Sequence, residues 1–284
     1  MGYSRRGFLA ETCAFGAVSS LFGVQRPVSS TRSNPIDKSM TALLSGVRTD
    51  GADGTEVLKK RIDAILSMRP LPARCLVLPE SCLPDGNDSG RSDIRELRRM
   101  FAADGVDAIV AEKGCVHLVQ TPGCDIMLLD CRYGAFAPAV QEYLAANLPR
   151  WKRPVFICAS NPPQWMQQGR EVSLVVQGTP FVELLEAVPC LAGYIHGGTG
   201  RWSCAHERAG RNRFTTMLSL PSAGSAGDIG HVVLRTSHGG AVAELHQDGF
   251  RPLQEHPSGG VRTDWSAMVA ANRGAKCRFD WSAT

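Results

Sequence analysis

The sequence predicts an α/β domain built as a four-layer α/β/β/α sandwich, in which two mixed sheets pack face to face and helices cover their outer faces. Two patterns in the 284-residue chain predict this arrangement. Up to residue 197, short apolar runs alternate with segments of helical periodicity, as in layered α/β domains. Beyond residue 197, glycine-rich turns separate further apolar runs without a helical period between them. No internal repeat or break in composition interrupts this pattern, so we expect one domain.

Apolar runs of strand length locate the predicted strands. The runs in the first part of the chain are 41–47, 75–78, 108–111, 116–119, 126–129, 155–158 and 191–196. The later runs are 214–218, 232–234 and 242–245. Because turns alone separate the later runs, they predict a β meander.

Local signals place four helices between the strands. Asp53, followed three residues later by Glu56, forms a capping box at the start of the first. Asp93 begins the second, and Pro138 suits the first turn of the third because that turn needs no N–H group from it. Pro180 precedes the fourth. Apolar residues at helical spacing follow each signal, which predicts that one face of each helix is buried.

The two ends of the chain differ from its middle. Residues 4–9, Ser-Arg-Arg-Gly-Phe-Leu, resemble a twin-arginine export signal, and an apolar stretch too short for a membrane-spanning helix follows them. We therefore expect residues 1–38 to be an export signal and linker, and the mature protein to be periplasmic or extracellular. The alternative is a disordered basic N-terminus. The predicted domain covers 39–250, and residues 251–284 form a tail whose structure the sequence does not predict.

Charge and cysteine usage narrow the class of protein. The net charge of +4 includes three arginines and one glutamate within residues 1–29, and without that segment it is +2. This charge is too small to predict binding to nucleic acid or to a membrane surface. None of the ten cysteines forms a Cys-x-x-Cys pair, and most lie in apolar runs. We therefore expect buried free thiols rather than disulfides or a zinc site.

The stretch 190–202, Cys-Leu-Ala-Gly-Tyr-Ile-His-Gly-Gly-Thr-Gly-Arg-Trp, carries the strongest functional signal. A buried strand that ends in a glycine-rich turn delivers a loop to the edge of a sheet where the functional residues of α/β proteins collect. Together with 126–130 and the Pro162-Pro163 turn, this stretch resembles the calcineurin-like metallophosphoesterases in order and spacing. The resemblance extends over 41–247. It implies the four-layer fold and a pair of metal ions that hydrolyse phosphoesters.

The metal ligands of that family are largely absent from this chain. At the five motif positions stand Gly46-Val47-Arg48, Pro79-Glu80, Glu112-Lys113-Gly114-Cys115, Ser160-Asn161-Pro162-Pro163 and Gly197-Gly198-Thr199-Gly200. Of the ligand positions only Glu80 keeps a plausible metal ligand, and one carboxylate cannot hold two divalent cations. We therefore expect a binding or structural module without a dinuclear centre, cofactor or catalytic residue. The alternative is an active hydrolase that holds divalent metal ions through unusual ligands.

Basic residues stand at or beside the motif positions and suggest a different use of the same pocket. The candidate anion-binding residues are Arg48, Glu80, Lys113, Asn161, His196 and Arg201. In this hypothesis the cationic side chains replace the metal ions and bind a small anionic ligand. It predicts that the heads of the three basic residues converge near Glu80. The sequence predicts no particular protein partner.

A second family also offers an enzymatic interpretation. Glu80, Lys113 and Cys131 occur in the chain order of the Glu, Lys and Cys of nitrilase-type amidases, and a carboxylate base beside a thiol nucleophile is sound chemistry. The spacing from Glu80 to Cys131 is far shorter than in that family. This interpretation also leaves the Pro162-Pro163 turn and residues 196–202 unexplained, so it is the weaker alternative.

Overall fold

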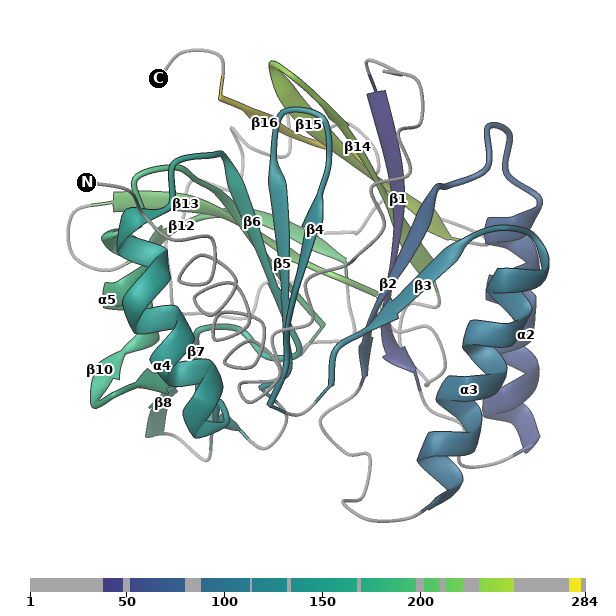
Figure 1. Ribbon diagram of the computed structural model, residues 1–284, viewed down its shortest axis with the longest axis horizontal. Coiled ribbons are helices and arrows are strands. Elements are labelled where there is room, and N and C mark those ends of the chain that lie inside the picture. Colours follow the sequence, from purple (N-terminus) through teal and green to yellow (C-terminus); the bar gives the residue numbers. More distant parts are fainter. Residues whose placement is uncertain are drawn as a thin grey trace, which may run out of the picture.

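Two six-stranded mixed sheets pack face to face and form the centre of the molecule (Figure 1). The computed structural model describes residues 38–47, 52–79, 88–112, 114–131, 134–167, 170–197, 202–209, 213–221, 230–247 and 276–281. Residues 1–37 lie outside this set, so the predicted export signal stays a prediction.

The first sheet, sheet A, has the strand order β16-β15-β14-β1-β2-β3. Strands β1, β2 and β3 are parallel to one another, and β14, β15 and β16 extend the sheet by antiparallel pairing. The strands of sheet A are β1 (Lys38–Val47), β2 (Arg74–Pro79), β3 (Asp107–Val110), β14 (Gly230–Ser237), β15 (Gly240–Gln247) and β16 (Lys276–Asp280).

The second sheet, sheet B, has the order β12-β13-β11-β6-β5-β4. Strands β5, β6, β11 and β13 are parallel, and the edge strands β4 and β12 run antiparallel to their neighbours. The strands of sheet B are β4 (Val116–Gln120), β5 (Asp125–Leu129), β6 (Val155–Ala159), β11 (Leu191–His196), β12 (Ser203–Ala209) and β13 (Arg213–Ser219).

Helices cover the outer face of each sheet, α2 and α3 on sheet A and α4 and α5 on sheet B (right and left in Figure 1). The helices are α2 (Ala52–Leu66), α3 (Asp88–Ala103), α4 (Pro138–Asn147) with the 3-10 turn η2 (Leu148–Arg150), and α5 (Phe181–Glu186). Two short ribbons pair β7 (Gln164–Gln167) with β8 (Arg170–Ser173), and β9 (Val175–Val176) with β10 (Thr179–Pro180). Within the described ranges no helix has the length and apolar character needed to span a membrane.

Alternation along the buried strands builds three apolar layers. In β5, Ile126 and Leu128 pack between the sheets, whereas Met127 and Leu129 pack under the helices of sheet B. A strand buried on both faces needs an unbroken apolar run, because successive side chains point to opposite faces. The third layer lies between sheet A and the helices α2 and α3. The predicted four-layer α/β fold is therefore confirmed.

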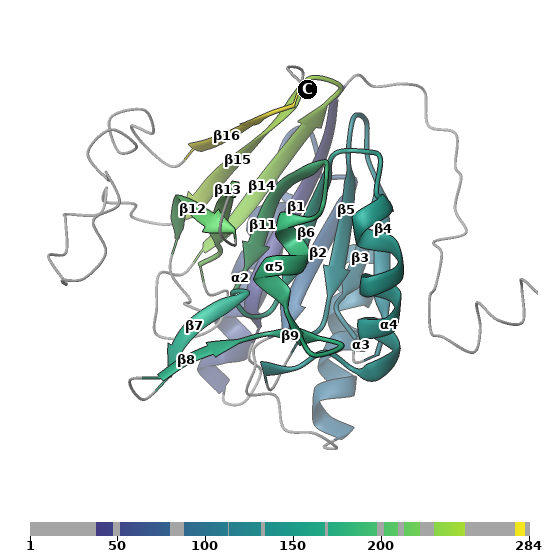
Figure 2. The same cartoon turned by 90° about the vertical axis from the view of Figure 1, so that its left-hand side faces the viewer.

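Three details differ from the sequence prediction. The predicted meander is wrong, because β13 belongs to sheet B while β14 and β15 belong to sheet A. Periodicity identifies a strand but does not say which sheet it joins. Helix α3 begins at Asp88 rather than at Asp93. Strand β16, in the tail that could not be predicted, lies beside β15 at the edge of sheet A (Figure 2).

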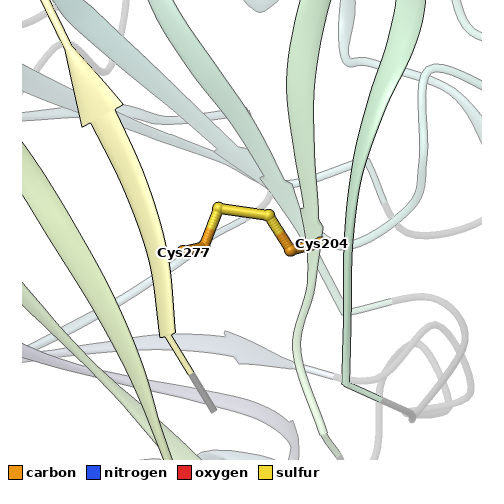
Figure 3. Close-up of a disulfide and its surroundings, with 2 residues drawn as sticks. All are labelled: Cys204 and Cys277. Atoms are coloured by element: carbon orange, nitrogen blue, oxygen red, sulfur yellow. A yellow bond between two sulfur atoms is a disulfide. The ribbon is translucent and has the colours of Figure 1, made fainter. Parts of the chain in front are cut away.

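One disulfide joins the two sheets. Cys204 on β12 and Cys277 on β16 are bonded across the sandwich (Figure 3). The expectation that the cysteines are free was wrong for this pair. It is confirmed for Cys75, Cys124 and Cys158, which are buried free thiols in the core.

Candidate functional site

The carboxyl ends of strands from both sheets meet at one edge of the sandwich, which we call the strand-end edge. Gly197, which follows β11, approaches Ser45 of β1 so closely that a Cβ atom on Gly197 would lie 1.9 Å from Ser45 Oγ. The same Cβ would lie 3.7 Å from the carbonyl oxygen of Ser160, which follows β6. Only glycine fits a contact this close. The sequence therefore uses glycine here to bring sheets A and B together.

Polar side chains are buried along the strand-end edge. Full burial of such groups is uncommon in proteins and marks a place where function or hydrogen bonding requires them. The buried polar residues at the ends of β1, β5, β6, β11 and β13 are Ser45, Asp130, Ser160, His196 and Ser219. These residues give the strand-end edge a concentration of buried polar groups.

His196 is the last residue of β11 and is buried beside Tyr194, with 6.1 Å between the ring centroids. In the described part of the chain its Nδ1 atom has no hydrogen-bond partner. Burial lowers the pKa of His196 to about 4, because the charged imidazolium is poorly solvated there. The ring is therefore neutral at pH 7 and adds no positive charge to the site.

Asn161 ties the ends of three strands of sheet B together. Its side-chain Nδ2 donates to the carbonyl oxygen of Cys131 at 3.0 Å, and its backbone N–H donates to Cys131 Sγ at 3.2 Å. Its own carbonyl oxygen accepts from the Tyr194 hydroxyl at 2.8 Å. These bonds link the segments that follow β5 and β6 to β11, so Asn161 has a structural part at this edge.

Cys131, the nucleophile in the amidase interpretation, is fully buried under the helices of sheet B. Burial raises the pKa of its thiol to about 12. A thiol that remains protonated at neutral pH is a poor nucleophile. The environment of Cys131 therefore gives the amidase interpretation no support.

The remaining predicted site residues are Arg48, Glu80, Lys113 and Arg201, and all four lie outside the described residues. The convergence of the three basic side chains near Glu80 therefore stays a prediction. Of the six anion-binding candidates, the structure places Asn161 and His196, which lie at the ends of the adjacent strands β6 and β11.

A group of three donors that sequence reasoning missed lies where β3 leads into β4. A ligand atom each from Glu112, Cys115 and His117 lies within 4.8 Å of the other two. Glu112 is ion-paired with Arg98 of α3, and His117 is buried with no described partner for its Nε2 atom. The sequence pattern is Glu-x-x-Cys-x-His, and without a second Cys and His pair this pattern does not by itself predict a zinc site.

Burial dominates the protonation of this group as well. It lowers the pKa of His117, and it raises the pKa of Cys115, which the carboxylates of Glu112 and Asp130 raise further. These shifts keep the imidazole neutral and the thiol protonated while no cation is present. A metal ion would compete with the thiol proton.

A pair of histidines lies on sheet A away from this edge. His231 of β14 and His246 of β15 are directly opposite in the strand pairing and stack with their centroids 5.1 Å apart. Burial, together with the nearby His246 and Arg61, lowers the pKa of His231 to about 3. Among the described residues these two rings do not belong to a group of three donors that could hold a metal ion, and their stacking is a packing contact.

Comparisons with known proteins give similarity in fold alone. No family model matches the chain, and no curated protein matches it. PhoD matches with a TM-score of 0.49 and 7% identity over 73% of this chain and 65% of PhoD. GAP50 from Plasmodium, described as the anchor in the inner membrane complex, matches with a TM-score of 0.46 and 8% identity over 75% of this chain and 85% of its own.

A third match is a predicted phosphoesterase from Streptococcus pneumoniae, with a TM-score of 0.38 and 8% identity over 86% of this chain and 98% of its own. Similarity at these levels does not bear on what the chain binds or catalyses. Function therefore has to be argued from the residues at the strand-end edge.

Proposed function

We propose that this chain is an exported protein of metallophosphoesterase-like fold that lacks a dinuclear metal centre and acts as a binding or structural module. The observation that carries this proposal is the hydrogen bonding of Asn161, which stands at the fourth of the motif positions that resemble the family. Asn161 Nδ2 donates to Cys131 O at 3.0 Å, so the side-chain amide is engaged with the backbone of its own sheet. Among the residues that the structure describes, no group of three or more His, Cys, Asp or Glu donors includes His196.

The packing of the strand-end edge supports the same proposal. Two divalent ions need several oxygen or nitrogen donors around each of them. At the junction of the sheets, Ser45 and Gly197 are in such close approach that no side chain could be accommodated between them. The described positions nearest that junction also include Ser160, whose hydroxyl has no described partner. A serine hydroxyl is a weak substitute for the lost carboxylate and imidazole ligands.

The test of this proposal combines metal analysis with an activity assay. Protein purified without chelators should contain fewer than two equivalents of manganese, iron or zinc. It should hydrolyse bis(p-nitrophenyl) phosphate no faster than buffer when each of these metals is added. Two bound ions together with turnover would overturn the proposal in favour of an active hydrolase with unusual ligands. In that case Glu80→Ala should abolish the rate.

Export is the second part of the proposal. The Cys204–Cys277 disulfide supports it, because disulfides form and persist mainly outside the reducing cytoplasm. Residues 1–38 fused to a folded reporter should be exported, and the double substitution Arg5→Lys and Arg6→Lys should retain the reporter inside. Equal retention or equal export of both fusions would reject the twin-arginine assignment.

The ligand of the module is proposed to be a small anion held by Arg48, Lys113 and Arg201. The support is their position at or beside the motif segments, where they would offset the charge of the missing metal ions. Inorganic phosphate is a suitable probe. Phosphate binding that is lost when all three are replaced by glutamine, and unchanged in Arg150→Gln, would agree with this. Phosphate binding equal in both variants would reject it.

A further inference from the structure

We propose that Glu112, Cys115 and His117 form a binding site for a single zinc ion where β3 leads into β4. This inference goes beyond the proposed function and does not depend on it, because one ion on these three donors differs from a dinuclear centre in stoichiometry. Glu112 and Cys115 stand at the third motif position, at the carboxyl end of β3 and so at one side of the strand-end edge. None of the three residues was among the site candidates predicted from the sequence.

A tight turn brings the first two ligands together. Strand β3 ends at Val110, and the backbone N–H of Ala111 still bonds to Val77 O at 3.0 Å, which fixes the chain as it leaves the sheet. The N–H of Cys115 then bonds to Glu112 O at 3.1 Å. Gly114 has a positive φ of 77°, a conformation in which glycine is favoured. The turn therefore places the side chains of Glu112 and Cys115 near one another.

The third ligand comes from the strand that follows the turn. His117 is the second residue of β4 and is paired with Leu128 of β5, so its position is set by sheet B. It is 9% exposed, and in the described part of the chain its Nε2 atom has no hydrogen-bond partner. Buried polar atoms are nearly always satisfied. A metal ion bound to Nε2 would satisfy this one.

The distances are close to those around a bound ion. With Zn–N and Zn–O bonds of about 2.0–2.1 Å and Zn–S of about 2.3 Å, donors on a tetrahedral zinc ion lie about 3.5 Å apart. The three donors here lie within 4.8 Å of one another. Small side-chain rotations would close the difference. Glu112 and Cys115 are half-buried at a loop, where such rotations meet little resistance.

Charge and ligand type favour zinc over the hard cations. A thiolate and an imidazole suit zinc, whereas calcium and magnesium prefer oxygen ligands. A zinc ion with one thiolate and one carboxylate is neutral overall. Arg98 is paired with Glu112, and the carboxylate of Asp130 lies close enough to affect Cys115. A carboxylate has two oxygens, so Glu112 can accept from Arg98 through one and bind zinc through the other.

Three protein ligands leave a fourth position open. Three ligands plus a water molecule is the pattern of zinc sites that bind an exchangeable ligand, whereas structural sites use four protein ligands. Glu112 and Cys115 are half-buried, so solvent reaches these two ligand residues. The site can therefore take a water molecule or a small anion as its fourth ligand.

The test uses the full chain, stripped of metal with a chelator and titrated with Zn²⁺ by calorimetry and with Co²⁺ by absorption spectroscopy. We expect one equivalent of zinc, and a cobalt–thiolate charge-transfer band. Even outer-sphere partners contribute about 10–100-fold to metal affinity, so Cys115→Ser and His117→Gln should each weaken zinc binding by at least about 100-fold. Cys115→Ser should also remove the cobalt band. The matched controls, Cys190→Ser at a half-buried thiol and His238→Gln at an exposed ring, should bind as the unsubstituted protein does.

The possible results separate this inference from the proposed function. No zinc binding, or binding that Cys115→Ser leaves unchanged, would overturn the zinc site while the proposed function stands. One equivalent that depends on Cys115 supports the zinc site. Two equivalents together with phosphodiester turnover would overturn the proposed function. If His117→Gln fails to fold by circular dichroism, the half-buried Cys115→Ser variant decides the matter with the cobalt band as its readout.

Discussion

The two sheets are joined at both sides of the sandwich, but in different ways. On one side lie the edge strands β3 and β4, which the chain connects directly through the turn that contains Glu112 and Cys115. On the other lie β16 and β12, which the Cys204–Cys277 disulfide connects. Cysteine therefore occurs at both connections between the sheets, as Cys115 on one side and as Cys204 and Cys277 on the other. The side chains around each cysteine determine whether it can form a disulfide or bind a metal ion.

On the disulfide side the surroundings are apolar. Phe279 of β16 meets Phe156 edge to face, with 4.8 Å between the ring centroids. Gly193 makes room for this contact, since a Cβ there would lie 2.8 Å from the Phe279 ring. On the β3–β4 side the neighbours of Cys115 are a carboxylate and an imidazole. Cysteine therefore forms a crosslink where its neighbours are apolar, and it is a candidate metal ligand where its neighbours are polar.

Removal of the disulfide should have the largest effect on stability. The double substitution Cys204→Ser and Cys277→Ser should lower the free energy of unfolding by about 4 kcal/mol, because the bond closes a loop between residues 73 apart in the sequence. Urea denaturation without reductant measures this loss. Cys190→Ser, which removes a thiol outside the disulfide, should change stability by less than about 0.5 kcal/mol. Equal losses of stability in the two variants would mean that the disulfide does not stabilise the contact between the sheets.

The middle of the strand-end edge should respond to pH through His196. Its pKa in the folded protein is about 4, against an ordinary 6.5. Between these values the unfolded chain binds a proton that the folded chain does not. Stability is therefore complete above pH 6.5 and falls as the pH drops towards 4, by about 3 kcal/mol in all.

The substitution His196→Gln should remove this contribution, and unfolding measured from pH 7 to pH 4 should show a shallower slope. The buried His231 contributes its own slope in both proteins. The exposed His238→Gln is the control and should leave the slope unchanged. An unaltered slope in His196→Gln would mean that the ring is solvated in the folded protein.

Asn161 should have a smaller effect, because it joins strand ends within one sheet rather than joining the two sheets. Asn161→Ala should lower the free energy of unfolding by about 2 kcal/mol, since it leaves the Cys131 carbonyl without the donor at 3.0 Å. Asn147→Ala removes an amide that bonds to Tyr143 O within helix α4, and it should cost less than about 1 kcal/mol. Denaturation of the two variants side by side measures the difference. Equal losses of stability would mean that the Asn161 amide contributes no more to folding than an amide that bonds within a helix.

Much of the fold could be predicted from the sequence because the central strands are buried on both faces. The runs 126–129 and 155–158 are apolar throughout, and each is a strand of sheet B. The edge strands β12 and β16 were missed because polar side chains interrupt their patterns. The disulfide between them depends on which strands lie opposite in space. Local sequence patterns do not show which strands lie opposite one another.

The candidate site was predictable only in part, for a similar reason. Asn161 and His196 follow or end apolar runs, so their place at the strand-end edge could be inferred from the chain alone. What could not be inferred is that burial leaves His196 neutral and that Asn161 donates to Cys131. The donors Glu112, Cys115 and His117 are divided between a turn and the next strand. Their convergence becomes visible only in three dimensions.

The most direct test of the account is an anomalous difference map from crystals soaked with Zn²⁺, recorded at the zinc absorption edge. The account predicts a single peak bounded by Glu112, Cys115 and His117, and no peak at the junction of Ser45, Ser160 and Gly197. Two peaks a few ångströms apart at that junction would contradict it. They would show a dinuclear centre at the strand-end edge and an enzyme in place of a binding module.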